Sequence, residues 1–234
     1  MAVPEHILQQ HSVWRGAAFA RPGEVVATGY GLLDRELPGG GWPRGGLTEV
    51  LGAHKGIGEL EVLMPALAAL STAGKRVVWL APPHLPYAPA LAAAGVDLAN
   101  LAVVRAPGRR DALWAAEQVL RSGACRALLA WFQRASYPEL QRLAAAAEAG
   151  SAFVALFRPR DAEREPSPAC LRLALEPAAT GLAVRIFKRR GPPAAGPLLV
   201  PLARPVHALG RSAFSTPADR QPRTHRSVGV PVHA

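Results

Sequence analysis

Residues 50–60 read VLGAHKGIGEL, a short apolar run followed by a glycine-rich turn and a second apolar segment. This layout is that of a phosphate-binding loop, in which a strand leads through glycines into a helix and backbone N–H groups surround the phosphates. The full pattern, G-x-x-x-x-G-K-[ST], also needs a lysine for the terminal phosphates and a hydroxyl for Mg²⁺. Here Glu59 and Leu60 follow Gly58. A carboxylate repels phosphate and leucine has no oxygen ligand, so we predict a degenerate loop without ATP hydrolysis.

The glycines of this stretch, Gly52, Gly56 and Gly58, also fit a simpler interpretation. Glycine adopts positive φ without steric cost, so the same residues suit any tight turn between a strand and a helix. On the local sequence alone both alternatives stay open.

Short apolar runs bounded by turn residues alternate with longer segments of helical character along the chain. This alternation predicts an α/β fold with a mainly parallel central sheet, right-handed crossovers and helices on both faces. Pro65 lies inside the first predicted helix, where we expect a kink or a late start. The predicted strands cover residues 47–51, 77–81, 101–105, 127–132 and 152–157, and the predicted helices cover 58–73, 87–94, 111–122 and 137–149.

Four collinear segments resemble the ATPase core of RecA-type recombinases. Residues 25–52, VVATGYGLLDRELPGGGWPRGGLTEVLG, look like the opening of that core, where a T-G-x-x-x-L-D element precedes a glycine-rich turn, a strand and the phosphate loop. Residues 75–106 and 112–132 resemble the following strands and helices, and residues 171–202 resemble the closing antiparallel strands. The resemblance implies a RecA-like P-loop-type core over residues 24–203.

The same resemblance identifies catalytic positions that this chain has replaced. The catalytic glutamate of RecA-type ATPases falls on Pro83, the Mg²⁺-binding aspartate falls on Trp131, and the Lys-Thr pair falls near Glu59 and Leu60. The resemblance therefore implies a pseudo-ATPase, which is not an enzyme and has no catalytic residue, cofactor or metal site. The alternative is a divergent DNA-dependent ATPase with substitutes such as Lys55 or Lys75.

Three short motifs narrow the resemblance within the RecA-like proteins. The turn G-I-G-E-L at 56–60, the early VWRG at 13–16 and the closing KRRGP at 188–192 resemble the ImuA family, also described as SulA-like. That family implies an accessory factor of SOS-induced translesion DNA synthesis and mutagenesis. Its implied partners are ImuB, an inactive polymerase relative, and an error-prone DNA polymerase subunit, with RecA or DNA as further candidates. The SulA-like label leaves a second alternative, an inhibitor of cell division that binds the tubulin-like ring protein.

Positive charge is concentrated in the last part of the chain. Residues 177–234 hold nine Arg or Lys and one acid, Asp219, and so carry +8 of the net charge of +10. Such a segment commonly meets nucleic acid or an acidic protein surface. We expect three parts: an N-terminal arm at 1–23, the RecA-like domain at 24–203, and a basic, disordered tail at 204–234 rich in Pro, Ser, Thr and Arg.

Two groups of residues outside the closing hairpin are candidate contacts. Trp14 lies on an amphipathic segment of the arm. The resemblance to recombinases, whose N-terminal element docks on the neighbouring protomer, implies self-association through Trp14, and the alternative is packing on its own core. Arg158 and Arg160 lie at the place of the second DNA-binding loop of recombinases. They are candidate DNA contacts, although the acids that follow them, Asp161, Glu163 and Glu165, nearly cancel the positive charge and favour a solvated turn.

The hairpin RIFKRRGPP at 185–193 is the leading candidate surface. Strand alternation points Arg185, Phe187 and Arg189 to one side. It points Ile186, Lys188 and Arg190 to the other. By resemblance, Lys188 and Arg190 match basic residues that recombinases direct across a filament interface. We expect them to meet an acidic partner or DNA, against the alternative of a solvated hairpin end.

Composition argues against a membrane or secreted protein. No apolar run approaches the roughly 18 to 20 residues of a membrane span, and the first residues lack a basic region followed by a long apolar stretch. We therefore expect a cytoplasmic location. Cys125 and Cys170 are the only two cysteines, with no C-x-x-C motif. They predict buried free thiols rather than a disulfide or zinc site.

Overall fold

The computed structural model describes residues 25–52 and 56–202. The predicted arm at 1–23 with Trp14, the tail at 204–234, and Lys55 lie outside the described residues. By its internal contacts the chain divides after Leu202, and the account below concerns the first unit.

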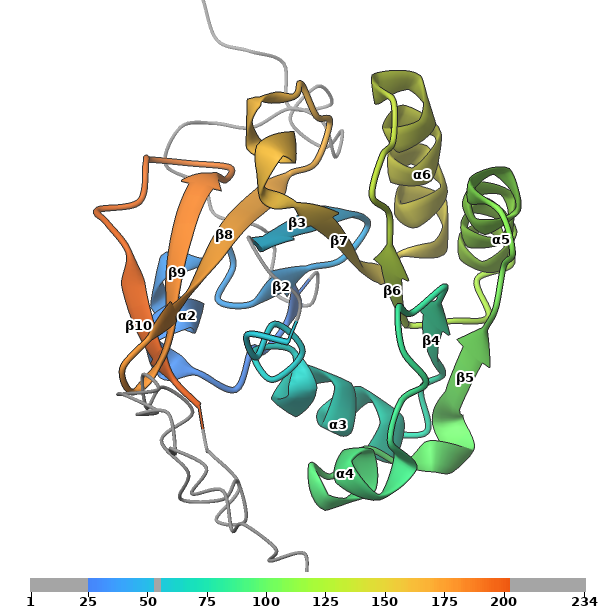
Figure 1. The fold of residues 1–234 in the computed structure, drawn as a ribbon, viewed down its shortest axis with the longest axis horizontal. Helices are drawn as coiled ribbons and strands as arrows, with labels where there is room; N and C mark the ends of the chain where they lie inside the picture. The colour runs from blue at the N-terminus through green and yellow to red at the C-terminus, as the bar shows by residue number, and fades with distance from the viewer. Residues whose placement is uncertain (1–24, 53–55, 203–234) are drawn as a thin grey trace, which may run out of the picture. The chain divides into compact units, whose positions relative to one another are not determined.

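A central sheet of eight strands organises the described part of the chain (Figure 1). The strand order is β10-β9-β8-β3-β7-β6-β4-β5. Every neighbouring pair is parallel except the two pairs that β9 makes with β8 and β10. The predicted mainly parallel sheet with antiparallel closing strands is therefore confirmed. The strands are β3 (Gly46–Gly52), β4 (Val77–Leu80), β5 (Leu101–Val104), β6 (Ala127–Trp131), β7 (Phe153–Pro159), β8 (Leu171–Ala178), β9 (Gly181–Lys188) and β10 (Leu198–Pro201).

Helices cover both faces of this sheet, as predicted. One hydrophobic cluster packs α2, α3 and α4 against the sheet, and a second cluster packs α5 and α6 against it (Figure 1). Strand β3 shows why there are two clusters, because Val50 points into the first and Leu47 into the second. The helices are α2 (Gly31–Glu36), α3 (Met64–Thr72), α4 (Ala88–Ala93), α5 (Arg109–Arg121) and α6 (Tyr137–Gly150), with short 3₁₀ turns η1 (Leu98–Asn100) and η2 (Arg160–Arg164).

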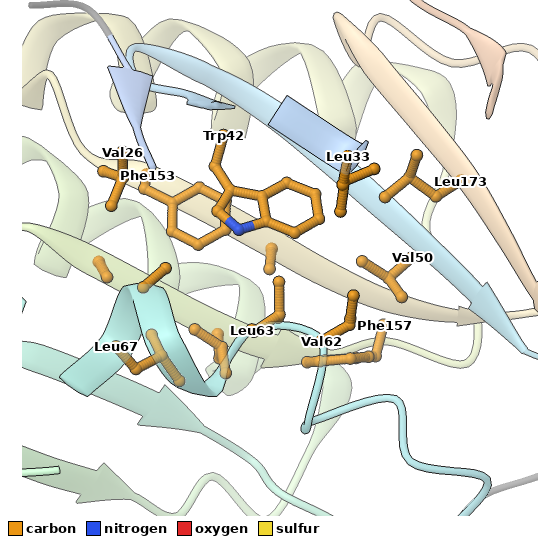
Figure 2. Packing of buried hydrophobic residues seen from close by; sticks show 14 of the residues in the cluster. Val26, Leu33, Trp42, Val50, Val62, Leu63, Leu67, Phe153, Phe157 and Leu173 are labelled. Carbon is orange, nitrogen blue, oxygen red and sulfur yellow. The ribbon is translucent and has the colours of Figure 1, made fainter. Parts of the chain in front are cut away.

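Aromatic stacking anchors the opening segment to the first face. Strands β1 (Val25–Val26) and β2 (Trp42–Pro43) form a small antiparallel pair. The Trp42 ring stacks on Phe153 of β7, with ring centroids 5.7 Å apart. Figure 2 shows both rings among the buried side chains, with Leu63 and Leu67 from the α3 region also in the cluster. The opening segment therefore belongs to the same core as the sheet.

The first predicted helix begins later than its expected start at residue 58. Residues 56–63 form bends and turns, and α3 starts at Met64 with Pro65 in its first turn. Proline suits a first turn because its missing N–H has no partner there in any helix. The late start expected from Pro65 is confirmed, and the predicted helical turn over residues 58–63 was wrong.

Both thiols are free. Cys125 is buried, and burial raises the pKa of its thiol to about 11. Cys170 is half-buried, and burial raises its thiol pKa as well. In the described part of the chain, no helix combines the length and the apolar character that a membrane span requires.

Candidate functional site

The candidate site lies at the carboxyl end of β3, the strand between β7 and β8. Gly56 and Gly58 adopt φ of 79° and 99°, a region that favours glycine. A Cβ added to Gly58 would come within 2.7 Å of Leu202 Cδ1, so the turn also packs closely. Five residues separate Gly52 from Gly58, one more than the phosphate-loop pattern has between its glycines.

The Glu59 carboxylate binds the backbone of its own turn. Its Oε1 accepts a hydrogen bond from the Gly56 N–H at 3.1 Å, and its Oε2 accepts one from the Ile57 N–H at 3.0 Å. Successive N–H groups in such a turn form a concavity that suits an anion. In this chain the anion is a side chain of the protein itself.

A second carboxylate adds negative charge beside the turn. Burial, and then the negative charge of Glu59, raise the pKa of Glu61 above its ordinary value. The turn also ends without a regular helix, since α3 starts only at Met64. The partial positive charge of a helix N-terminus acts within its first turn, so α3 gives the Gly56–Glu59 turn little help in holding phosphate. Leu60 instead packs against the first hydrophobic cluster.

Aromatic rings occupy the ends of the neighbouring strands. Trp131, the last residue of β6, stacks on Phe157 of β7 with centroids 4.7 Å apart and an interplanar angle of 14°. Trp79 of β4 also contacts Trp131, and the centroids of these two rings are 5.7 Å apart. Phe157, labelled in Figure 2, belongs to the first cluster. Trp131 therefore completes a core and offers no oxygen to a hard cation.

Pro83, the position that replaces a catalytic glutamate, lies on an exposed loop after β4. This loop and the end of β5 enclose a pocket of about 330 Å³. Ala81 at its entry has φ of 49°, which is uncommon for a residue with a Cβ. The pocket is lined by Ala81, Pro82, Pro83, His84, Leu85, Val103, Arg105 and Ala106. Within the described ranges, no three His, Cys, Asp or Glu side chains group as metal ligands would.

A buried ionic cluster lies on the face of β3 that is opposite the first hydrophobic cluster. Glu49 accepts hydrogen bonds from Arg158 Nη1 at 3.0 Å, Arg172 Nε at 2.5 Å and Ser167 Oγ at 3.0 Å. Arg158 also pairs with Glu165 at 2.6 Å, and its side chain is 0% exposed. Arg158 is therefore an internal residue, which corrects its assignment as a candidate DNA contact.

The cluster fixes the segment that follows β7. Arg172 donates from Nη2 to the Ala162 carbonyl at 2.7 Å and from Nη1 to the Glu163 and Glu165 carbonyls. The segment expected to be a DNA loop or a solvated turn is thus a 3₁₀ turn held from inside the protein. Sequence reasoning missed this cluster. The sequence feature that could have indicated the cluster is Glu49, a lone acid inside the apolar strand GLTEVLG.

Arg160 and Arg185 lie on the outer side of this region and are half-buried. Both pair with Glu163, at 3.1 Å from Arg160 and 2.6 Å from Arg185, and Arg160 also pairs with Glu176. The hydrogen bond from Arg185 is the main cause that holds the pKa of Glu163 below its usual value. Neither arginine is an uncompensated charge in this structure.

The four basic residues at the end of the hairpin have different surroundings. The alternation is as predicted up to Phe187: Ile186 points into the first cluster, while Arg185 and Phe187 face the other side. Lys188 Nζ donates to the Ser167 carbonyl at 2.7 Å, and burial together with the charge of Arg172 lowers the Lys188 pKa. Arg190 is exposed.

Arg189 is bound on several sides. It donates to the Glu36 carboxylate of α2 at 2.8 Å and to the carbonyls of Glu36, Pro192 and Pro193. Lys188 and Arg190 therefore remain the surface candidates of the hairpin, whereas Arg189 ties the hairpin end to α2.

The family model that matches this chain is that of the cell division inhibitor SulA, over residues 47–154. The match runs from β3 into β7 and includes the Glu59 turn, but it covers less than half of the chain. Similarity to SulA is thus found in the part of the chain that carries the candidate site.

Comparison with individual proteins shows similarity to RecA as well as to SulA. The chain is 31% identical over 100 residues to SulA of Edwardsiella piscicida, covering 43% of this chain and 60% of that protein. It is 33% identical over 100 residues to RecA of Picosynechococcus sp., covering 28% of that protein, and 35% identical over 106 residues to RecA of Streptomyces avermitilis, covering 27%. The chain thus spans less than two thirds of these relatives. A crystal structure of SulA from Pseudomonas aeruginosa aligns with 48% of this chain and 97% of its own, at 24% identity and a TM-score of 0.42.

Proposed function

We propose that this chain is a non-catalytic, RecA-like accessory factor of the bacterial response to DNA damage. In this proposal its core is a P-loop-type domain that has lost nucleotide chemistry. It acts in the cytoplasm during SOS-induced translesion synthesis, assembled with an ImuB-like inactive polymerase and an error-prone DNA polymerase subunit. Similarity to SulA and to RecA supports the damage-response setting.

The observation that carries the non-catalytic part is the contact of Glu59 with its own turn. The carboxylate takes the Gly56 and Ile57 N–H groups, which are the donors that a working loop offers to phosphate. A nucleotide would have to displace this carboxylate and then lie beside both Glu59 and Glu61. The negative charges of the phosphates and of these two carboxylates would repel one another. This repulsion is stronger where water is partly excluded.

The second support is the aromatic contact of Trp131. A Mg²⁺-dependent reaction needs oxygen ligands and a residue that orients water. Trp131 stacks on Phe157 at the strand end where a metal-binding aspartate is expected, and Pro83 replaces the general base. Both replacements agree with a scaffold role.

Titration with a fluorescent ATP analogue and Mg²⁺, together with phosphate-release assays, tests the non-catalytic proposal. For the natural protein we expect no saturable binding and no phosphate release above the buffer control. A Glu59→Lys, Leu60→Thr variant restores the two missing side chains and should gain nucleotide binding without turnover. Glu148→Lys, an equal charge change at an exposed position near the end of α6, should bind no better than the natural protein. Mg²⁺-dependent turnover by the natural protein would establish the divergent ATPase instead.

A second candidate function is inhibition of cell division. The observation that favours it is the match of residues 47–154 to the SulA model. Parallel pull-downs distinguish the two candidates, with the immobilised chain offered an inactive Y-family polymerase relative or the tubulin-like division protein. Retention of the polymerase relative alone is the result expected for the accessory factor. Retention of the division protein alone would replace it with the inhibitor.

A further inference from the structure

Three loops leave the sheet side by side at the carboxyl ends of β5, β4 and β6. In the register of the sheet, Val104 lies beside Leu80, and Leu80 lies beside Ala130. From this edge β4 continues into α4 on one face of the sheet, whereas β6 continues into α6 on the other. In open α/β sheets the crevice where neighbouring strands part to opposite faces is the common place for a ligand.

Two of these loops carry an arginine, and none of the three contains a carboxylate. Residues 81–87 contain His84, residues 105–108 contain Arg105, and residues 132–136 contain Arg134. The first turn of α5 adds Arg109 and Arg110.

Two acids follow the loops, Asp111 in α5 and Glu139 in α6. Arg109 Nη1 donates to the two carboxylate oxygens of Glu139 at 2.6 and 2.7 Å. The Ser136 N–H also donates to this carboxylate. Burial alone would raise the pKa of Glu139, but these hydrogen bonds and the Arg109 charge outweigh it, and the pKa lies below its usual value. Glu139 is therefore ionised, and its negative charge neutralises the positive charge of Arg109.

The strand-end arginine cluster is defined as Arg105, Arg110 and Arg134. All three side chains are exposed, and none has an ion pair or side-chain hydrogen bond among residues 25–52 and 56–202. Arg105 lines the pocket of about 330 Å³ together with His84. Tyr87, the last residue of the first loop, is 72% exposed, and Tyr137, which directly follows the third, is 42% exposed.

We propose that the strand-end arginine cluster binds single-stranded nucleic acid. Guanidinium groups pair with phosphate in a planar, two-point geometry. Arg105 after β5, Arg110 in the first turn of α5 and Arg134 after β6 therefore suit the repeated charge of a phosphate backbone. The exposed rings of Tyr87 before α4 and Tyr137 at the start of α6 provide stacking faces for bases, which is how single strands are held without sequence preference. The inference goes beyond the proposed function, which names protein partners, and either can fail without the other.

Fluorescence anisotropy of the full chain with labelled oligothymidylate of about 15 nucleotides, at several salt concentrations, tests the proposal. The variant Arg105→Gln, Arg110→Gln, Arg134→Gln should bind at least tenfold more weakly. Its plot of log affinity against log salt should be flatter by about 2, because each phosphate contact on a single strand contributes about 0.7.

A matched control removes the same charge at the other edge of the sheet. Arg76 and Arg126 precede β4 and β6, and Arg121 ends α5, so Arg76→Gln, Arg121→Gln, Arg126→Gln leaves the cluster intact. This control should bind within about twofold of the natural protein with the same salt slope, since phosphate contacts are local. A further variant, Tyr87→Leu with Tyr137→Leu, should weaken binding about fivefold or more while keeping the salt slope.

Three results would overturn the proposal: no binding by the natural protein, equal losses in the two triple variants, or displacement of the oligonucleotide by polyglutamate at equal charge concentration. The last would assign the cluster to an acidic protein. Far-UV circular dichroism checks that each variant is folded. If the triple variant does not fold, Arg105→Gln alone should still lower the salt slope by about 0.7, and an unchanged slope would contradict the proposal.

Discussion

Glu49 combines full burial with ionic partners on two other strands. Its carboxylate joins Arg158 of β7 to Arg172 of β8, and Arg172 in turn holds the carbonyls of the segment after β7. Buried ion pairs gain little over apolar residues of the same shape, but removal of one partner leaves an uncompensated charge inside the protein. Removal of Glu49 would therefore leave Arg158 and Arg172 without the anion that they share.

Glu49→Ala should lower the free energy of unfolding by about 3 to 5 kcal/mol, because two buried guanidinium groups lose their shared anion. Urea denaturation at neutral pH measures this. Glu148→Ala on the surface should change the value by less than about 0.5 kcal/mol. A loss at Glu49 as small as the loss at Glu148 would show that the cluster contributes little to stability.

Two elements, η2 and the β8–β9 hairpin, meet through Glu163. Arg160 on the same turn and Arg185 on β9 share its carboxylate. The lowered Glu163 pKa means that folding favours the ionised form, mainly through the Arg185 hydrogen bond. The resulting stability is present above the unfolded-state pKa of about 4.3 and is lost as the pH falls through the lower folded-state pKa.

Glu163→Gln should therefore reduce the acid dependence of stability. Urea denaturation at about pH 7 and at pH values below about 4 compares the natural protein with the variant. We expect the natural protein to lose more stability on acidification than the variant, and Glu148→Gln to behave like the natural protein. Parallel pH profiles for the natural protein and Glu163→Gln would contradict the assignment.

At the scale of these elements, sequence patterns predicted strands β3 to β7 and helices α4 to α6 to within a few residues, whereas the closing strands were expected only from the resemblance to recombinases. The patterns failed at residues 58–63, where apolar spacing suggested helix. In the structure, Pro65 and the Glu59 contact with Gly56 and Ile57 keep this segment in turns. The failure lies at the candidate site, where a side chain competes with the helix for backbone donors.

Across the whole first unit, one sheet separates two cores. Leu67 of α3 lies in the first core and Leu143 of α6 in the second, both buried. Strands β3, β4, β6 and β7 each contribute to both cores, because their alternate residues face opposite sides. The two cores should therefore unfold together.

Leu67→Ala and Leu143→Ala should each cost about 2 to 5 kcal/mol, through lost burial and the cavity that remains. The two losses should add in the double variant, since the sites are on opposite faces and share no partner. In a Trp14→Phe, Trp114→Phe background, tryptophan fluorescence reports on Trp42 and Trp79 of the first core and on Trp131 packed against it, while far-UV circular dichroism reports on the whole unit. Leu143→Ala should shift both denaturation curves equally. A shift in circular dichroism without one in fluorescence would show that the cores unfold separately.

The sequence by itself determined the α/β character, the mainly parallel sheet and the absence of the phosphate-loop lysine and hydroxyl, because these depend on residues close together in the chain. The tertiary structure alone decided that Arg158 is internal, since its partner Glu49 is 109 residues away in the chain. It also decided that Trp131 completes an aromatic stack with Phe157, and that Arg105, Arg110 and Arg134 follow the carboxyl ends of β5 and β6, the two strands that flank β4. Such groupings depend on strand order and register, which bring distant residues together and which no local pattern encodes.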